Sequence, residues 1–232
     1  LPDNQVLCIS QSRSGLMWFG TYSGLAQGAP ALFQTINDED GLPSNAVAAI
    51  TSDSPSSWWV GTERGVTNLK MSAHKDGWRI KRAPETLLSD FQVMSLATEQ
   101  GTLWAGSFRA GLFEVDIATR KTRRYTVKSS EFDLGSDGIS VLTVTSSNHL
   151  FIGTYGGGLT IVDLASRESK RFTSSPPAVG AISDDRILSI FEDSKRRIWV
   201  GTLNGLNLYK PESATFKHFE YRMDDERTLS SN

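Results

Sequence analysis

One four-residue phrase recurs five times along the chain and constrains the fold more than any other feature. It consists of an aromatic residue, an apolar residue, a glycine and a hydroxyl residue, and its copies are Trp18–Thr21, Trp59–Thr62, Trp104–Ser107, Phe151–Thr154 and Trp199–Thr202. The glycines of successive copies lie 41, 45, 47 and 48 residues apart. An interval of about 40–45 residues is typical of one four-stranded blade of a β-propeller.

The rest of each unit repeats in step with this phrase. A second glycine follows each copy and predicts a tight turn with positive φ: Gly24, Gly65, Gly111, Gly158 and Gly205. A short apolar run precedes each copy and predicts an inner strand buried on both faces: Val6–Ile9, Val47–Ile50, Val93–Leu96, Val141–Val144 and Ile187–Ile190. A more polar run with an aromatic anchor ends each unit and predicts an outer strand: Phe33, Trp78, Tyr125, Phe172 and Phe219. Each unit is therefore expected to hold four strands, here called a (inner), b (the phrase), c and d (outer).

We predict an all-β fold, a β-propeller of four-stranded antiparallel blades, with one domain over residues 1–232. The expected blades are 1–41, 42–87, 88–135, 136–181 and 182–228, and residues 229–232 are expected to start a further repeat. The last residues, Leu229 to Asn232, echo the start of the second unit at Leu42–Asn45. This phase indicates part of a longer array, and a ring closed by contact between the first and fifth blades is the alternative.

Composition narrows the classes of partner. The 24 Lys and Arg residues nearly balance the 26 Asp and Glu residues, so the net charge of −2 creates no general field for nucleic acid or anionic lipid. We expect no nucleic-acid partner and no direct membrane contact. The single cysteine, Cys8, excludes an internal disulfide and a cysteine zinc set, and is expected to pack as a small apolar residue. No cofactor or metal is predicted, because the acidic turns Asp38–Asp40 and Asp224–Glu226 are expected to face solvent.

Strand parity places the candidate binding surface. In a four-stranded antiparallel blade, the b–c turns and the d–a connections emerge on the same face, and binding groups concentrate on loops held by a rigid scaffold. The candidate ligand-binding residues are Tyr22, Glu63, Arg64, Phe108, Arg109, Tyr155 and Asn204 on the turns, with Asn45 and Asp184 on the connections. Aromatic rings beside polar groups suit sugar rings, whereas the alternative is that these rings pack between adjacent blades. The first aromatic residue of each repeated phrase is expected to form inter-blade core.

These units resemble the two-component regulator propeller repeat. Leu42–Asn45, Phe191–Asp193, Ile198–Thr202 and Gly205–Tyr209 carry the resemblance, while Ser107 and Phe151 depart from the pattern. The resemblance implies the periplasmic, seven-bladed sensing region of a bacterial membrane sensor whose output is a histidine kinase, a hybrid kinase or a diguanylate cyclase. We accordingly expect a non-enzymatic module that senses a small molecule, with an oligosaccharide as the candidate ligand.

Two other functions stay open. One is a protein-interaction or homodimerisation platform without a small ligand. The other is an enzyme similar to the streptogramin lyase propellers, which needs paired histidines and acids, but His74, His149 and His218 occupy unrelated repeat positions. The glycine-rich stretch Thr154–Gly158 resembles a phosphate-binding loop, yet it lacks the following lysine and helix, so we interpret it as a lengthened b–c turn.

Overall fold

The structure is a computed structural model that describes residues 1–11, 17–29, 32–74, 77–129, 131–175, 179–221 and 229, without the side chains of 29, 32, 33, 71, 73, 74 and 77–84. Several residues named above fall outside the described residues or side chains. They are the rings of Phe33, His74 and Trp78, the acidic turn Asp224–Glu226 and the terminal residues Ser230–Asn232.

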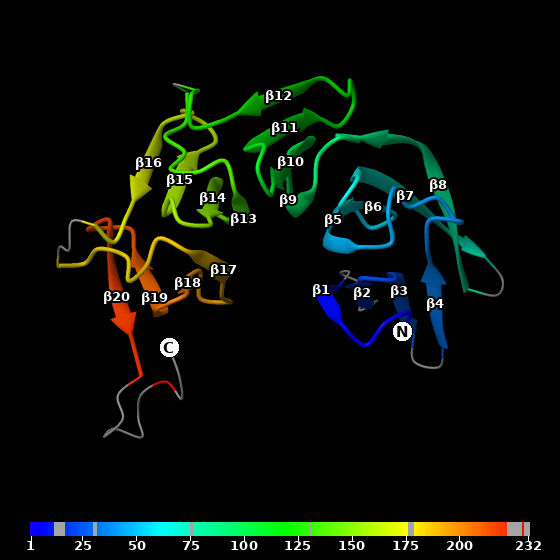
Figure 1. Cartoon of the computed structure of the whole chain (residues 1–232), viewed down its shortest axis with the longest axis horizontal. Helices are drawn as coiled ribbons and strands as arrows, with labels where there is room; N and C mark the ends of the chain where they lie inside the picture. Colours follow the sequence, from blue (N-terminus) through cyan, green and yellow to red (C-terminus); the bar gives the residue numbers. More distant parts are fainter. Residues whose placement is uncertain are drawn as a thin grey trace. The chain divides into compact units, whose positions relative to one another are not determined.

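Twenty strands form five four-stranded antiparallel sheets (Figure 1). The first sheet contains β1 (Val6–Gln11), β2 (Met17–Thr21), β3 (Gly24–Ala29) and β4 (Leu32–Ile36). The second contains β5 (Val47–Ser54), β6 (Ser57–Thr62), β7 (Gly65–His74) and β8 (Gly77–Leu87). The third contains β9 (Val93–Glu99), β10 (Thr102–Ser107), β11 (Leu112–Asp116) and β12 (Thr122–Tyr125). The fourth contains β13 (Ile139–Val144), β14 (His149–Thr154), β15 (Leu159–Asp163) and β16 (Ser169–Phe172), and the fifth contains β17 (Ile187–Glu192), β18 (Ile198–Thr202), β19 (Gly205–Lys210) and β20 (Thr215–Phe219).

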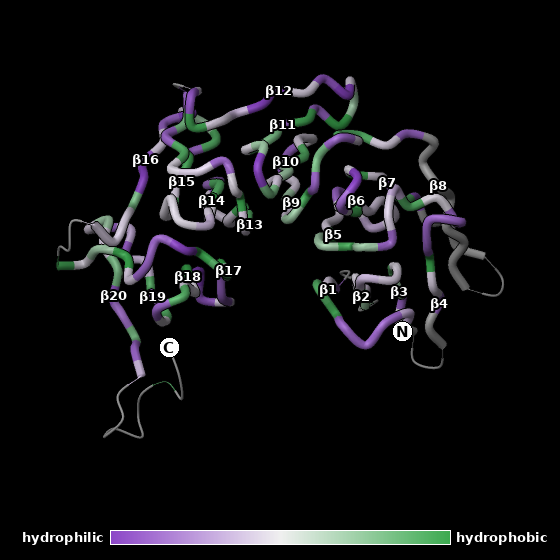
Figure 2. Tube along the Cα trace, viewed as in Figure 1, coloured by the Kyte–Doolittle hydropathy of each residue, from purple (hydrophilic) through white to green (hydrophobic). Residues whose placement is uncertain are grey.

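Every sheet keeps its strands in chain order, so each is a run of hairpins with the predicted order a, b, c, d. This confirms the prediction of an all-β fold with propeller-type blades. Hydrophobic residues gather on a and b strands such as β9 and β10, whereas the outer strand β12 is mostly hydrophilic (Figure 2). Among the described residues, no helix has the length and apolar character needed to cross a membrane.

The chain divides into two compact units: residues 1–108 with 113–123, and residues 109–112 with 124–232. Within each unit, the inner strand of one sheet packs on the inner strand and the b strand of the preceding sheet. In the first unit β5 packs on β1 and β2, and β9 packs on β5 and β6. In the second unit β17 packs on β13 and β14.

The glycine of the repeated phrase makes this packing possible. A Cβ atom added at Gly20 would lie 2.7 Å from Cγ1 of Val47, and one at Gly153 would lie 2.7 Å from Cγ2 of Ile187. These distances are shorter than real carbon contacts, so a larger residue would push away the next inner strand. The glycine therefore leaves space for the side chain of the first residue of the following sheet.

The first aromatic residue of the phrase forms core, as predicted. Trp18, Trp59, Trp104 and Phe151 are all buried. The rings of Trp18 and Trp58 lie 5.4 Å apart and join the first two sheets, while Phe151 contacts Tyr209 of the fifth sheet at 5.8 Å. In the fifth sheet, Trp199 is only half-buried. Inter-sheet aromatic contacts thus hold neighbouring blades together within each unit.

The expectation that every inner strand is buried on both faces is wrong for β1 and β17. Ile9 of β1 is 61% exposed, and Phe191 of β17 is 63% exposed. By contrast, no residue of β9 is exposed, although β9 and β17 both pack on the preceding sheet. An apolar run predicts a strand, but its second buried face depends on a neighbouring sheet that local sequence does not report.

Candidate functional site

The hydroxyl residue that ends the repeated phrase closes the b–c turn. Thr154 Oγ1 donates a hydrogen bond of 2.8 Å to the carbonyl of Gly158 and accepts one of 3.0 Å from the backbone N–H of Gly157. Thr21 and Thr202 bond in the same way to the carbonyls of Gly24 and Gly205. Because the threonine is buried and satisfied on both sides, the turn residues are held in a fixed position at the surface.

The second glycine of each unit is required by both backbone and space. Gly158 has a φ of 84°, and a Cβ atom there would lie 2.2 Å from the carbonyl oxygen of Phe172. Gly111 has a φ of 82°, and its added Cβ would lie 2.0 Å from the carbonyl oxygen of Tyr125. Strand c therefore begins directly against the end of strand d, and only glycine fits there. The Thr154–Gly158 stretch is accordingly a b–c turn between β14 and β15, as predicted.

The predicted turn residues all lie at the surface. Tyr22 is 51% exposed, Phe108 is 44% exposed and Tyr155 is 61% exposed, so none of these three rings packs into the inter-blade core. The remaining predicted turn residues are likewise exposed: Glu63, Arg64, Arg109 and Asn204. Within each compact unit, the b–c turns therefore present aromatic and charged groups to solvent.

The b–c turns and d–a connections meet, as strand parity requires. In the first unit, the Ser23 hydroxyl donates a hydrogen bond of 2.9 Å to Asp3. In the second unit, the backbone N–H of Tyr155 donates to the carbonyl of Gly138 at 3.0 Å, and that of Gly156 donates to the carbonyl of Asp185 at 3.1 Å. Turn and connection thus form one continuous surface within each unit.

A compact cluster forms on this surface in the second unit. Tyr155 and Arg186 form an isolated antiparallel bridge between the turn and the connection before β17. The Arg186 guanidinium holds the Asp184 carboxylate in a two-pronged contact, with Nε at 2.9 Å from Oδ1 and Nη2 at 2.7 Å from Oδ2. This contact lowers the pKa of Asp184 and raises the pKa of Arg186. The exposed Tyr155 thus lies on a segment paired with that of Arg186, whose guanidinium is held in a fixed orientation by Asp184.

Sequence reasoning missed Arg186, and the structure changes the role of two predicted residues. Asp184 is occupied by Arg186, so it orients this cation. Asn45 is occupied as well, because its amide donates to Asp38 at 3.0 Å and its oxygen accepts from the Asp38 N–H at 2.8 Å. The sequence signal that could have identified Arg186 is a basic residue directly after two aspartates in a d–a connection.

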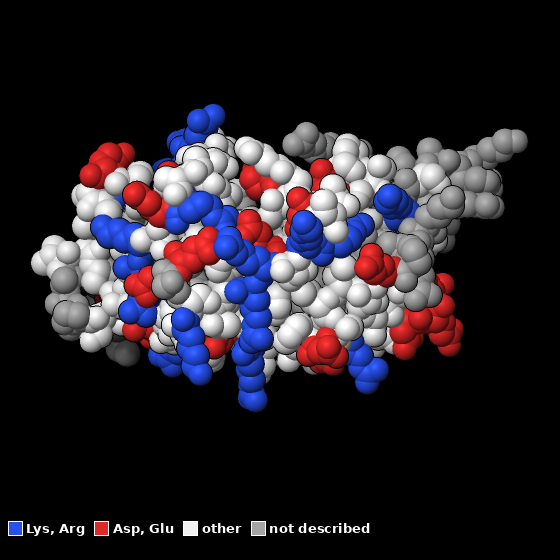
Figure 3. Space-filling model, turned by 90° about the horizontal axis from the view of Figure 1, so that it is seen from above, with Lys and Arg blue, Asp and Glu red and all other residues white. Residues whose placement is uncertain are grey.

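The acidic connection before the second sheet uses its carboxylates to shape the chain. Asp40 accepts a hydrogen bond of 3.1 Å from the backbone N–H of Asn37, in addition to the contact between Asp38 and Asn45. No group of three or more His, Cys, Asp or Glu residues with metal-binding geometry occurs among the described residues. The face shown in Figure 3 carries basic and acidic side chains interspersed.

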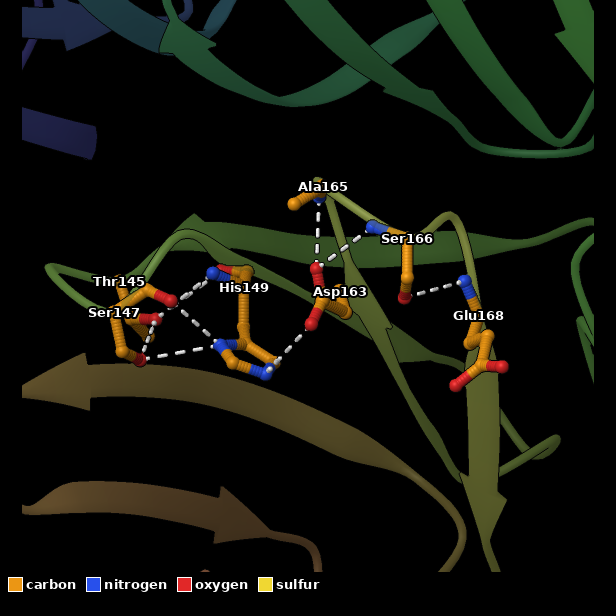
Figure 4. A network of polar contacts seen from close by, with 7 residues as sticks. All are labelled: Thr145, Ser147, His149, Asp163, Ala165, Ser166 and Glu168. Carbon is orange, nitrogen blue, oxygen red and sulfur yellow. Dashed lines mark hydrogen bonds and ion pairs between the residues drawn. The ribbon is translucent and has the colours of Figure 1, made fainter.

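The two histidines whose side chains are described contact different partners. The ring of His149 places Nδ1 2.8 Å from the carbonyl of Ser147 and Nε2 3.9 Å from Asp163, as Figure 4 shows. His218 instead contacts the carbonyl of Ala181 and approaches Glu220 at 3.9 Å. Cys8 packs against the core of the first unit, and burial raises the pKa of its thiol to about 12. This thiol is therefore protonated at neutral pH.

Comparison with known proteins identifies the repeat. The two-component regulator propeller model matches residues 1–23 and 181–204, which confirms the resemblance. Each matched stretch runs from a d–a connection through strands a and b into the b–c turn. The chain is also 26% identical over 177 residues to histidine kinase P4 of Formosa agariphila, covering 72% of this chain and 12% of that protein.

Solved structures show the same fold. The extracellular domain of BT3049 from B. thetaiotaomicron, named as a hybrid two-component system, matches with a TM-score of 0.72 and 24% identity over 94% of this chain and 30% of that one. The extracellular domain of BT4673 from the same organism, named as a one-component system, matches with a TM-score of 0.74 and 23% identity over 94% of this chain and 28% of that one. The chain thus spans less than a third of each of these relatives.

Proposed function

We propose that this chain is a ligand-sensing module of a bacterial two-component-type signalling protein and that it acts outside the cytoplasm without catalysing a reaction. The premise is that the chain carries two-component regulator propeller repeats and shares the fold of extracellular sensor domains. Binding would alter the packing between blades, since a ligand drives a signal only through different affinities for two states.

The observation that carries this proposal is the Tyr155–Arg186 pair. An exposed aromatic ring stacks on the apolar C–H face of a sugar, and the neighbouring guanidinium donates hydrogen bonds to its hydroxyls. Asp184 fixes the guanidinium before any ligand arrives, which lowers the ordering cost of binding. The candidate ligand is therefore an oligosaccharide bound on the b–c and d–a face.

The test is a thermal-shift screen of the purified chain against a panel of oligosaccharides. A ligand present at a hundred times its Kd stabilises the folded state by about 2.7 kcal/mol. For any oligosaccharide that shifts the melting midpoint, Tyr155→Ala should weaken binding. Phe191→Ala is the matched control, because Phe191 is equally exposed but lies on β17. Unchanged affinity in the Tyr155→Ala variant would remove the site assignment.

A second candidate function is an interaction platform that holds a partner protein or a second copy of the chain. It is favoured by apolar side chains exposed on the inner strands, namely Ile9 at 61%, Leu188 at 49% and Phe191 at 63%. Light scattering over a range of protein concentrations distinguishes the candidates. A mass that rises with concentration, together with no response to oligosaccharides, would favour the platform.

A further inference from the structure

A cleft of about 370 Å³ lies between the fourth and fifth sheets, inside the second unit. It opens among the turns β13–β14, β17–β18 and β19–β20, at the opposite end of the strands from the b–c turns. Its floor consists of Phe151, Ile161, Ile198 and Tyr209. A volume of this size is within the range of small-molecule sites, and an apolar floor with a few polar groups at the rim is their usual composition.

The repeat explains why the floor is apolar at this place. In the second and fifth repeats, an aspartate stands six residues before the first aromatic residue of the phrase. In the second repeat this residue, Asp53, accepts a hydrogen bond of 3.1 Å from the indole N–H of Trp59. In the fourth repeat, the residues that correspond to this aspartate and tryptophan are Thr145 and Phe151. Phenylalanine has no N–H to satisfy, so both members of the polar pair are replaced together. The fourth repeat therefore lacks both the carboxylate and the indole of that pair.

The repeat also shows which side chain can cover the aromatic ring at this place. In the third repeat, Arg120 is the ninth residue after the second glycine. Its guanidinium lies over the Trp59 ring at 4.9 Å and covers it. The corresponding residue of the fifth repeat is Ala214. Both residues have positive φ, 62° and 49°, so the two turns share a backbone conformation and differ in the side chain that they present. The corresponding place in the first compact unit is also a cleft, of about 390 Å³ and lined by Trp59 and Arg120, so the arginine covers the ring face without closing the cleft. The side chain of Ala214 is too short to cover the Phe151 ring in this way.

The charges at the rim select the ligand. The carboxylate of Glu192 is occupied by Ser146, whose backbone N–H donates at 2.7 Å and whose hydroxyl also donates. His149 is held by Ser147 and Asp163 (Figure 4). Arg196 is exposed, and no described residue forms an ion pair with its guanidinium. It is therefore the rim group that is available to an anion.

We propose that this cleft binds a small carboxylate with an apolar body, either an aromatic ring or a short acyl chain. The body would contact Phe151 and Tyr209, whose rings meet edge to face at 5.8 Å, and the carboxylate would pair with Arg196. A ligand there touches both sheets at once and stiffens their packing. This site is separate from the oligosaccharide face, so either site can exist without the other.

The test is saturation-transfer NMR and calorimetry of the whole chain with benzoate, 3-phenylpropionate and hexanoate, and with 3-phenylpropanol as the uncharged analogue. At least one carboxylate should show saturable binding and exceed 3-phenylpropanol in affinity. Ala214→Arg, which restores the residue of the third unit, should weaken this binding about tenfold or more, and Arg196→Gln should weaken it about fivefold. Lys195→Gln is the matched control on the same turn and should bind as the unchanged chain does.

Three results would overturn the proposal: no saturable binding of any of the three carboxylates up to about 10 mM, equal binding of 3-phenylpropanol, or full binding by Ala214→Arg. Circular dichroism establishes that each variant is folded. Should Ala214→Arg fail to fold, Phe151→Leu removes the ring that the apolar body would contact and should weaken binding by a similar factor. Tyr155→Ala should leave carboxylate binding unchanged, which separates a failure here from a failure of the oligosaccharide site.

Discussion

The indole Nε1 of Trp199 donates a hydrogen bond of 3.0 Å to Oδ2 of Asp193. The same carboxylate accepts from the backbone N–H groups of Lys195 and Arg197 and from the Arg197 side chain. One aspartate thus connects the a–b turn to the b strand. In the second repeat, Asp53 holds Trp59 in the same way.

This relationship predicts a dependence of stability on pH. Hydrogen bonding by Trp199, followed by the contacts from Arg197, lowers the pKa of Asp193. A carboxylate with a lowered pKa in the folded state stabilises fully above the pKa of the unfolded chain, about 3.9, and loses this contribution as pH falls further. We expect the unfolding free energy of the unchanged chain to fall more steeply below about pH 4 than that of Asp193→Asn. Urea titrations from pH 2.5 to 7 measure this difference, and parallel curves would contradict it.

The b–c turn of the fourth repeat contains two glycines that can be compared directly. Gly156 and Gly158 both have positive φ, 107° and 84°, but a Cβ atom at Gly156 meets nothing within 4 Å whereas one at Gly158 meets a carbonyl oxygen. Gly156→Ala should cost about 1–3 kcal/mol from backbone strain alone. Gly158→Ala should cost more, because strand d must also move. Chemical denaturation measures both, and equal losses would show that the close approach to Phe172 is relieved at no cost.

The buried hydroxyl of Thr154 should contribute measurably to stability. Thr154→Val keeps the shape of the side chain but leaves the carbonyl of Gly158 and the N–H of Gly157 without this partner. The expected loss is about 1–3 kcal/mol. Thr154→Ser retains the hydroxyl and should lose less. A valine variant as stable as the serine variant would indicate that these hydrogen bonds do not hold the turn.

The thiol of Cys8 should be unreactive in the folded protein. Burial raises its pKa to about 12, so the thiolate that attacks alkylating reagents is scarce at pH 8. Incubation with iodoacetamide at pH 8, followed by mass spectrometry, should show slow modification of the folded chain and rapid modification in guanidinium chloride. Equal rates in the two conditions would contradict the burial of this side chain.

The sequence by itself determined the blade. Its period, its paired glycines and its apolar runs specify four short strands and three turns, because these signals act within about 45 residues of one another. Strand parity likewise placed the exposed residues Tyr22, Phe108 and Tyr155 at the end of each blade where its b–c turn emerges. These inferences need only local geometry, since a hairpin reverses the chain wherever a glycine of positive φ permits it.

Only the tertiary structure decided which groups are available at the surface. Asp184 and Asn45 looked like free binding groups in the sequence, yet each is occupied by a hydrogen-bonding partner that folding brings against it. The exposure of β1 and β17, and the cleft above Phe151, likewise depend on which sheet packs on which. The physical reason is that hydrogen bonding and burial are properties of pairs of surfaces, whereas a repeat pattern describes one segment at a time.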